Sequence, residues 1–215
     1  WKIEVVLPGY ADVLGQRIEG GEEPNPCSAV LRVTRGGTAI LIGGDAPLVS
    51  WERLEPVLSQ AIVLRTPHHG GGIDEGNPTW TEQDLYARVS PEVAVVSVGT
   101  NNGHAHPRKP QMEAIRGRNC RLLCTQLTTR CHVAPLTHRE EALEHVGGVT
   151  YPYRHLVVIG DPKLYRPKTE VPCAGSMIAW LDTQGTLGFE PPSGGWHDNL
   201  VMRLDHPMCQ RSPPF

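Results

Sequence analysis

The sequence predicts an α/β domain whose functional groups lie on loops that follow the strands. Short apolar runs of strand length alternate with segments in which apolar residues recur at helical spacing. The 215 residues include 23 glycines and 20 prolines, so turns are frequent and the elements are short. This excludes helical bundles and coiled coils. With 39% hydrophobic and 20% charged residues, the chain has the composition of an ordinary globular protein.

Five segments in the first half have the length and β-branched content of strands. They are residues 2–7, 28–33, 39–42, 61–64 and 93–98. Between and after them, helices are predicted over residues 50–60, 81–88 and 109–116. Ser50 and Thr81 are the expected N-caps of the first two helices, and Pro107 shortly precedes the third.

The character of the sequence changes after about residue 118, so two units are predicted, residues 1–118 and residues 119–215. The second unit is richer in cysteine and histidine. In it, a helix is predicted over residues 137–145. Strands are predicted over residues 155–159, 175–181 and 200–204.

Charge and hydropathy limit the possible partners. The net charge of −3 provides no long-range attraction for nucleic acid. The apolar runs are far shorter than the roughly 18 residues that cross a bilayer, so no membrane partner is expected. No secretory signal opens the chain, and a cytoplasmic location is predicted. Because the chain starts at Trp1, just before a predicted strand and without an initiating Met, it is expected to be part of a longer protein.

Polar side chains that suit a metal ion follow three of the predicted strands. They are Asp45 after residues 39–42, His68 and His69 after residues 61–64, and His104 and His106 after residues 93–98. If these strand ends meet at one edge of a sheet, a carboxylate and imidazoles come together, as in a metal site with an open position for water. Simpler interpretations are a turn-forming or helix-capping role for the aspartate and a packing role for the histidine pair.

Five features occur in a fixed order along residues 1–118. They are a strand ending in Pro, an Asn and a Ser before an apolar strand, a strand ending in Gly-Asp, a strand ending in His-His-Gly, and Ser-Val-Gly followed by Asn and His-Pro. In this chain they are residues 5–8, Asn25 with Ser28, residues 40–45, residues 64–70, and residues 97–99 with Asn102, His106 and Pro107. This pattern resembles the second half of a metallo-β-lactamase-fold hydrolase, most closely the ComEC-type domain associated with DNA uptake.

The resemblance implies an αββα sandwich of which this chain supplies the second half, and a metal-dependent nuclease or phosphodiesterase. It implies two catalytic ions, Zn²⁺ or Mn²⁺, and a nucleic-acid or nucleotide substrate. Asp45 would bridge the ions, and either His68 or His69 would be a further ligand. By resemblance, Ser97, Asn102 and His106 would face the substrate or support the ligands. The predicted catalytic residues are accordingly Asp45, His68 and His106.

The chain also departs from the family pattern. The His-x-His-x-Asp-His motif, through which the family binds most of its metal, does not occur in these 215 residues. Gly71 stands where Ser is common, and His104-Ala105 replaces an aromatic residue and Gly. Two interpretations follow. In the first, an N-terminal half outside this sequence, in the same or a separate chain, completes the metal site. In the second, the chain is a degenerate homologue that serves as an interaction module in a larger assembly, such as a bacterial defence complex.

Cysteine and histidine in the second unit predict a structural zinc site. The predicted ligands are Cys131, Cys173, His206 and Cys209, with Cys124 and His197 in the same set. Thiolates and imidazoles together suit a closed site for Zn²⁺. Buried free thiols and disulfides are the alternatives.

Overall fold

A six-stranded mixed sheet dominates the computed structural model, which describes residues 1–9, 25–59, 61–75, 78–99, 103–128, 173–202 and 207–209. The strands lie in chain order: β1 (Lys2–Leu7), β2 (Val30–Arg35), β3 (Thr38–Ile42), β4 (Ala61–Arg65), β5 (Val93–Val96) and β6 (Arg121–Cys124). The first three strands pair antiparallel, and β3 to β6 run parallel. The predicted α/β class is confirmed.

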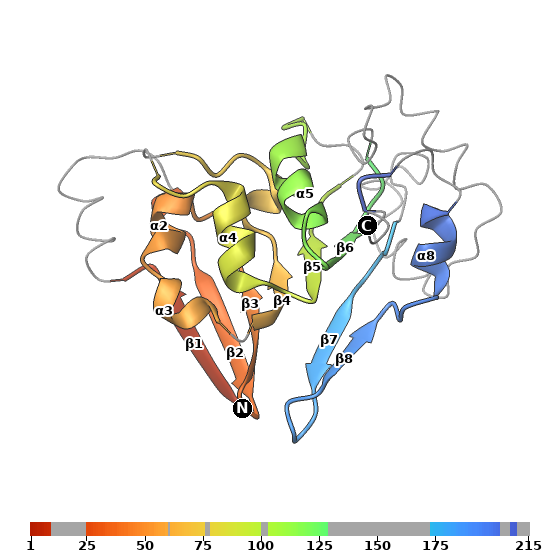
Figure 1. The fold of residues 1–215 in the computed structure, drawn as a ribbon, viewed down its shortest axis with the longest axis horizontal. Helices are drawn as coiled ribbons and strands as arrows, with labels where there is room; N and C mark the ends of the chain where they lie inside the picture. Colours follow the sequence, from red (N-terminus) through yellow and green to blue (C-terminus); the bar gives the residue numbers. More distant parts are fainter. Residues whose placement is uncertain are drawn as a thin grey trace, which may run out of the picture.

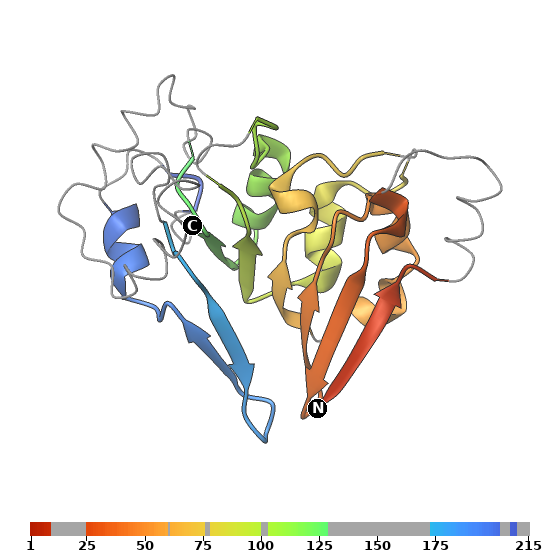
Figure 2. The same cartoon turned by 180° about the vertical axis from the view of Figure 1, so that it is seen from behind.

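Helices cover one face of this sheet (Figures 1 and 2). They are α2 (Leu48–Glu52), α3 (Glu55–Leu58), α4 (Glu82–Val89) and α5 (Lys109–Arg116), and two 3-10 turns, η1 (Asn25–Cys27) and η2 (Pro67–Gly70), lie in the connections. The core between the layers contains Trp51 and Tyr86 from the helices and Leu41 and Leu64 from the strands, all fully buried. This packing fixes the strand ends from which the candidate site projects.

A β-hairpin packs on the other face of the sheet. It consists of β7 (Ile178–Leu181) and β8 (Leu187–Glu190), and its side chains contact strands β4 to β6. Val63 and Leu123 of the sheet are buried beneath Phe189 of the hairpin. Near the turn of the hairpin, the Arg35 guanidinium donates a hydrogen bond of 3.2 Å to the Leu181 carbonyl. The hairpin therefore packs mainly on the part of this face that β4 to β6 form.

The first of the predicted helices is different in the structure. Instead of one helix over residues 50–60, two short helices form, and Ser50 lies inside α2 with Pro47 at the N-cap position. Pro56 lies in the first turn of α3. A proline has no N–H to donate to the preceding turn and disfavours helical geometry at the residue before it, so the helix is interrupted there. The predicted core residues Trp51, Leu54 and Leu58 are buried nevertheless.

The other two helices of the first unit are confirmed. Thr81 is the N-cap of α4, and its hydroxyl accepts a hydrogen bond from the Asp84 N–H while the Asp84 carboxylate accepts one from the Thr81 N–H. This reciprocal arrangement satisfies two backbone donors at the helix start. Helix α5 has the predicted bounds, with a proline in its first turn.

The second unit differs more. Strand β6 pairs parallel with β5, so the sheet continues beyond residue 118. A strand predicted over residues 200–204 is wrong at its start, because α8 (Trp196–Val201) is helical and the Asp198 carboxylate accepts the Gly194 N–H at 2.6 Å near the helix start. The predicted elements at residues 137–145 and 155–159 lie outside the described residues. Among the described helices, none has the length and apolar content to cross a bilayer.

Candidate functional site

The parallel strands bring the predicted site residues to one edge of the sheet. Asp45 follows β3 after two glycines, and His68 and His69 lie in η2 directly after β4. The His68 N–H donates to the Gly44 carbonyl at 2.9 Å, which ties the two strand exits together. A Cβ at Gly44 would lie 2.6 Å from the Ala29 carbonyl oxygen, so only glycine fits this close approach. The two strand exits thus bring Asp45 and the histidine pair to the same edge of the sheet.

His69 faces Asp45. Its Nε2 lies 3.7 Å from Asp45 Oδ1, and both side chains are partly exposed. Its Nδ1 lies 2.6 Å from the Ser97 carbonyl oxygen, which can only accept, so Nδ1 carries the proton and donates. Arg65 Nη2 is farther from the same nitrogen, at 3.4 Å. The Nε2 lone pair is therefore directed toward the Asp45 side.

This geometry fits a shared cation. Two ligands of a tetrahedral zinc at about 2.0–2.1 Å lie roughly 3.4 Å from each other, close to the observed separation of 3.7 Å. A histidine that donates its other ring N–H to a carbonyl is the usual arrangement of metal-binding histidines. The described part of the chain contains no group of three or more His, Cys, Asp or Glu that could hold an ion. Asp45 and His69 are thus a partial donor set.

His68 points to a different group of side chains. Its Nδ1 donates to the Gly72 carbonyl at 2.7 Å, and its ring meets the His106 ring edge-on with 5.2 Å between centroids. The His104 ring stacks on His106 at 5.8 Å and 18°. Both His68 and His69 have positive φ, 48° and 54°, a conformation that non-glycine residues adopt rarely. The loop thereby turns the two neighbouring imidazoles toward different partners.

Buried polar contacts hold this loop in place. The Gln111 side chain, fully buried in α5, donates a hydrogen bond to the Gly71 carbonyl and accepts one of 2.6 Å from the Tyr86 hydroxyl. The Gly70 carbonyl accepts the Arg108 N–H at 2.7 Å. Burial raises the pKa of Tyr86 well above its usual value, so its hydroxyl stays protonated as a donor. Sequence reasoning missed Gln111 and Tyr86, because only the packing of α4 on α5 reveals their role.

Two ionisable groups of the site have shifted pKa values. Burial lowers the pKa of the Arg65 guanidinium, the Asp45 carboxylate partly offsets this, and Arg65 donates to the Gly43 carbonyl. The pKa of His106 is lowered, first by burial and then by the positive charges of nearby histidines and Arg108. At neutral pH His106 is therefore a neutral imidazole, able to donate or accept a hydrogen bond.

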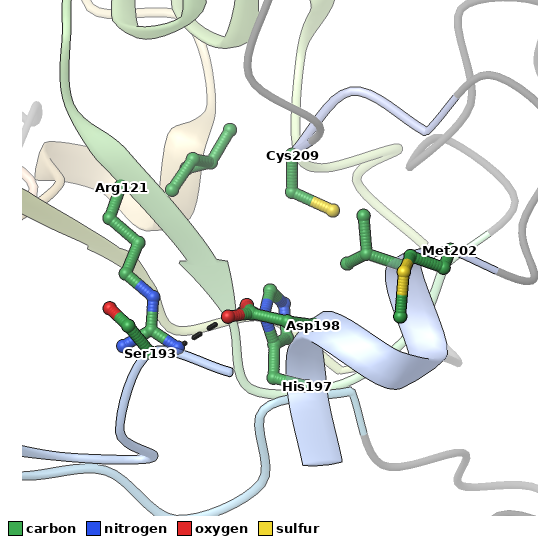
Figure 3. A pocket seen from close by; sticks show the side chains of 8 residues that line it. Arg121, Ser193, His197, Asp198, Met202 and Cys209 are labelled. Carbon is green, nitrogen blue, oxygen red and sulfur yellow. Dashed lines mark hydrogen bonds and ion pairs between the residues drawn. The ribbon is translucent and has the colours of Figure 1, made fainter. Parts of the chain in front are cut away.

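The predicted zinc ligands of the second unit are only partly described. Cys131 and His206, like Asn102 of the first unit, lie outside the described residues, and the zinc site stays a prediction. Cys173 is buried in the main core beside the strands. Cys209 and His197 line a separate cavity of about 300 Å³, into which Figure 3 shows their side chains pointing. The structure therefore brings these two predicted residues to one cavity, and Cys209 also packs against the core cluster that contains Cys173.

An ion pair that the sequence did not predict borders this cavity. Asp198 Oδ1 lies 3.4 Å from Arg121 Nη2 and 3.3 Å from His197 Nδ1 (Figure 3). The hydrogen bond to His197, the Gly194 N–H and the charge of Arg121 hold the pKa of the Asp198 carboxyl well below its usual range, although burial opposes them. Arg121 also donates to the Pro191 and Pro192 carbonyls. These bonds tie α8 to the edge strand β6.

Comparison with known proteins shows partial homology to competence and recombination proteins. The chain is 34% identical over 111 residues to "Competence protein ComA" of Neisseria gonorrhoeae, and 27% identical over 111 residues to "ComE operon protein 3" of Bacillus subtilis. It is 31% identical over 91 residues to "Recombination protein 2" of Haemophilus influenzae. These alignments cover 49%, 48% and 42% of the chain but only 15%, 14% and 11% of the relatives.

No protein-family model matches the chain, and no solved structure does. The similarity therefore supports the predicted ComEC-type resemblance over about half of the chain, and the curated relatives are several times longer than the segment that they share with it.

Proposed function

We propose that this chain supplies part of the site of a metal-dependent hydrolase of metallo-β-lactamase-like fold that cleaves phosphodiesters, as in a nuclease. The observation that carries the proposal is the pair Asp45 Oδ1 and His69 Nε2, 3.7 Å apart, with the His69 tautomer set by the Ser97 carbonyl. Similarity to proteins named for competence and recombination supports nucleic acid as the substrate class. Zn²⁺ and Mn²⁺ both suit a carboxylate with an imidazole.

The residues of this chain have distinct roles in the proposed site. Asp45 and His69 hold the metal, and two ions when bound would lower the pKa of a water molecule toward neutrality and offset charge on the phosphate. His106, neutral because of its lowered pKa, donates a hydrogen bond to an oxygen on which negative charge develops. His68 orients His106 through the edge-on contact of their rings. Between the two histidines of the pair, we assign the ligand to His69.

The remaining ligands would come from further polypeptide, in the same or a separate chain. A surface that supports this is the face of the sheet that the hairpin leaves uncovered. On β1, Trp1, Ile3 and Val5 alternate on one face and are 65%, 71% and 65% exposed. In register with Ile3 and Val5 lie Val33 and Leu31 of β2. Contiguous exposed apolar side chains mark an interaction surface.

A second β-layer is the occupant that fits this surface best. The hairpin already forms such a layer over β4 to β6, and its strand β7 packs Ala179 toward the sheet while Ile178 and Trp180, on the opposite side of the strand, are exposed. We expect an apolar sheet that carries histidine ligands to pack on β1 to β3. The proposed sandwich would thereby close over the strand ends that bear Asp45 and His69.

The test is the metal content of the purified full chain, measured by elemental mass spectrometry. In the complete protein we expect about two ions per chain, fewer in Asp45→Ala and His69→Ala, and an unchanged number in Asp74→Ala, an exposed carboxylate close to the same loop. His68→Ala should retain metal better than His69→Ala but hydrolyse a chromogenic phosphodiester more slowly than the wild type.

A metal content that neither Asp45→Ala nor His69→Ala lowers would contradict the proposal. The partial donor set favours one other function, a non-catalytic interaction module that retains the fold. Absence of metal from the wild type, together with binding of a partner through β1 to β3, would support that module instead.

A further inference from the structure

The loop between β5 and α5 presents two further side chains, His104 and Arg108, close to the turn that carries His68 and His69. His104 stacks on His106 at 5.8 Å, and His106 contacts His68 at 5.2 Å between ring centroids. Ala105, between the two stacked histidines, has a φ of 58°, which reverses the chain so that residues two apart lie face to face. His104 is exposed, whereas His106 is 8% exposed. A row of imidazoles thus leads to the surface from His68, the neighbour of His69 in η2.

Arg108 lies at the same rim. A Cβ built at Gly72 would be 2.9 Å from Arg108 Nη1, so the guanidinium rests directly on the loop that carries His68 and His69. Its backbone N–H is fixed on the Gly70 carbonyl at 2.7 Å. The next cation, Lys109, instead forms an ion pair of 3.6 Å with Glu113 on α5. The Arg108 guanidinium therefore lies over the Gly72 end of the loop that carries His68 and His69.

We infer that His104 and Arg108 bind a phosphate group of a nucleic-acid strand next to the phosphodiester that is cleaved. This inference rests on the proposed function and names the residues that hold the substrate. The guanidinium supplies charge and planar donors, and the His104 imidazole supplies an N–H donor to a phosphate oxygen.

The spacing suits a neighbouring phosphate. The two ring contacts place His104 at most about 11 Å from the His68 ring. A span of this size is a few times the roughly 3.4 Å rise per nucleotide of a DNA strand, so it lies within reach of the phosphates that flank a bound phosphodiester. Because His68 adjoins His69 in η2, a strand whose scissile phosphate lies at Asp45 and His69 would pass close to His104.

The carboxylate of Asp74 also lies at Gly72, with Oδ1 3.3 Å from the position of a Cβ there. Its negative charge opposes a phosphate at this rim, so removing the charge strengthens binding.

The experiment measures binding of a single-stranded DNA oligonucleotide to the metal-free full chain, by fluorescence anisotropy over a range of salt concentrations. Arg108→Ala weakens binding several-fold and reduces the slope of log K against log salt by about 0.7, the value for one phosphate contact on a single strand. Arg108→Lys restores the slope, because it keeps the charge. His104→Ala weakens binding with little change in slope, His104→Gln retains part of the affinity, and Asp74→Asn binds more tightly.

Arg118→Ala is the matched control, since it removes an exposed arginine beyond the other end of α5. Equal losses of DNA affinity in Arg118→Ala and Arg108→Ala would overturn the inference. Wild-type affinity in both His104→Ala and Arg108→Ala, or no DNA binding by the wild type, would overturn it as well. Metal content and hydrolysis do not enter this measurement. If Asp45 and His69 prove not to bind metal, the DNA-binding result is therefore unaffected. If His104 and Arg108 prove not to bind DNA, the metal content of the wild type is unaffected.

Discussion

Gly71 determines where the His106 ring can lie, and replacing it with alanine tests the geometry of the site directly. A Cβ at this position would be 2.3 Å from His106 Cε1, 2.8 Å from His106 Nδ1 and 2.8 Å from the His68 carbonyl oxygen. Real Cβ atoms do not approach other atoms so closely, so either the ring or the loop must move. The Gly71 φ is −75°, so alanine brings no backbone strain. The effect is therefore purely one of contact.

Two opposing contributions set the size of the effect. Replacing glycine with alanine at a compatible φ stabilises a protein by about 0.4–1 kcal/mol, because the unfolded chain loses freedom. Forcing extra volume into a packed site costs about 1–3 kcal/mol. Since the contact is with a ring that is 8% exposed and with backbone, we expect the cost to prevail. Gly71→Ala should lower the free energy of unfolding by roughly 1–2 kcal/mol.

Urea denaturation of Gly71→Ala, His106→Ala and the double variant measures this cost. Removing the ring relieves the shortest contacts, so Gly71→Ala should destabilise His106→Ala less than it destabilises the wild type, with a coupling of at least about 0.5 kcal/mol. Gly103→Ala is the control, because nothing lies within 4 Å of a Cβ there. It should be neutral or slightly stabilising.

A Gly71→Ala variant as stable as Gly103→Ala would refute this reasoning. So would additive effects of Gly71→Ala and His106→Ala, because the ring would then not occupy the space that the missing Cβ leaves.

Three further predictions concern the elements around the site. The pKa of Asp198 is held low, chiefly by the hydrogen bond to His197, so this carboxylate stabilises the fold above its unfolded pKa of about 3.9 and the contribution is lost as the pH falls below that value. In Asp198→Asn the loss of stability below about pH 4 should be shallower in urea titrations, and an unchanged slope would be evidence against the pairing. Thr81→Ala should cost about 1 kcal/mol of unfolding free energy through loss of the helix cap, while Thr81→Ser should cost little. Tyr86→Phe should lower the free energy of unfolding by about 1–3 kcal/mol, because the buried Gln111 side-chain oxygen loses its hydrogen-bond donor. A variant whose melting temperature equals that of the wild type would contradict this expectation.

Much of the local structure follows from the sequence alone. Apolar runs of strand length predicted strands β1 to β5. The N-cap of α4 was predicted from Thr81, and the bounds of α5 were also predicted from the sequence. These features depend on interactions among residues close in the chain, such as the reciprocal hydrogen bonds of Thr81 and Asp84. Local signals were misread where Pro56 divides a helix and where α8 replaces a strand.

For the candidate site, the sequence determined which residue types follow which strands, since Asp45 and the histidine pair occur at strand ends as predicted. The tertiary structure decided which of them face each other. His69 rather than His68 lies at Asp45, because the positive φ values of the loop turn adjacent imidazoles apart and the Ser97 carbonyl, distant in sequence, sets one tautomer. Likewise, β6 and the Gln111 contact to the loop depend on packing between segments far apart in the chain. The pattern of residues after the strands can predict which side chains are available to a site. How those side chains are oriented depends on the contacts that the folded chain makes around them.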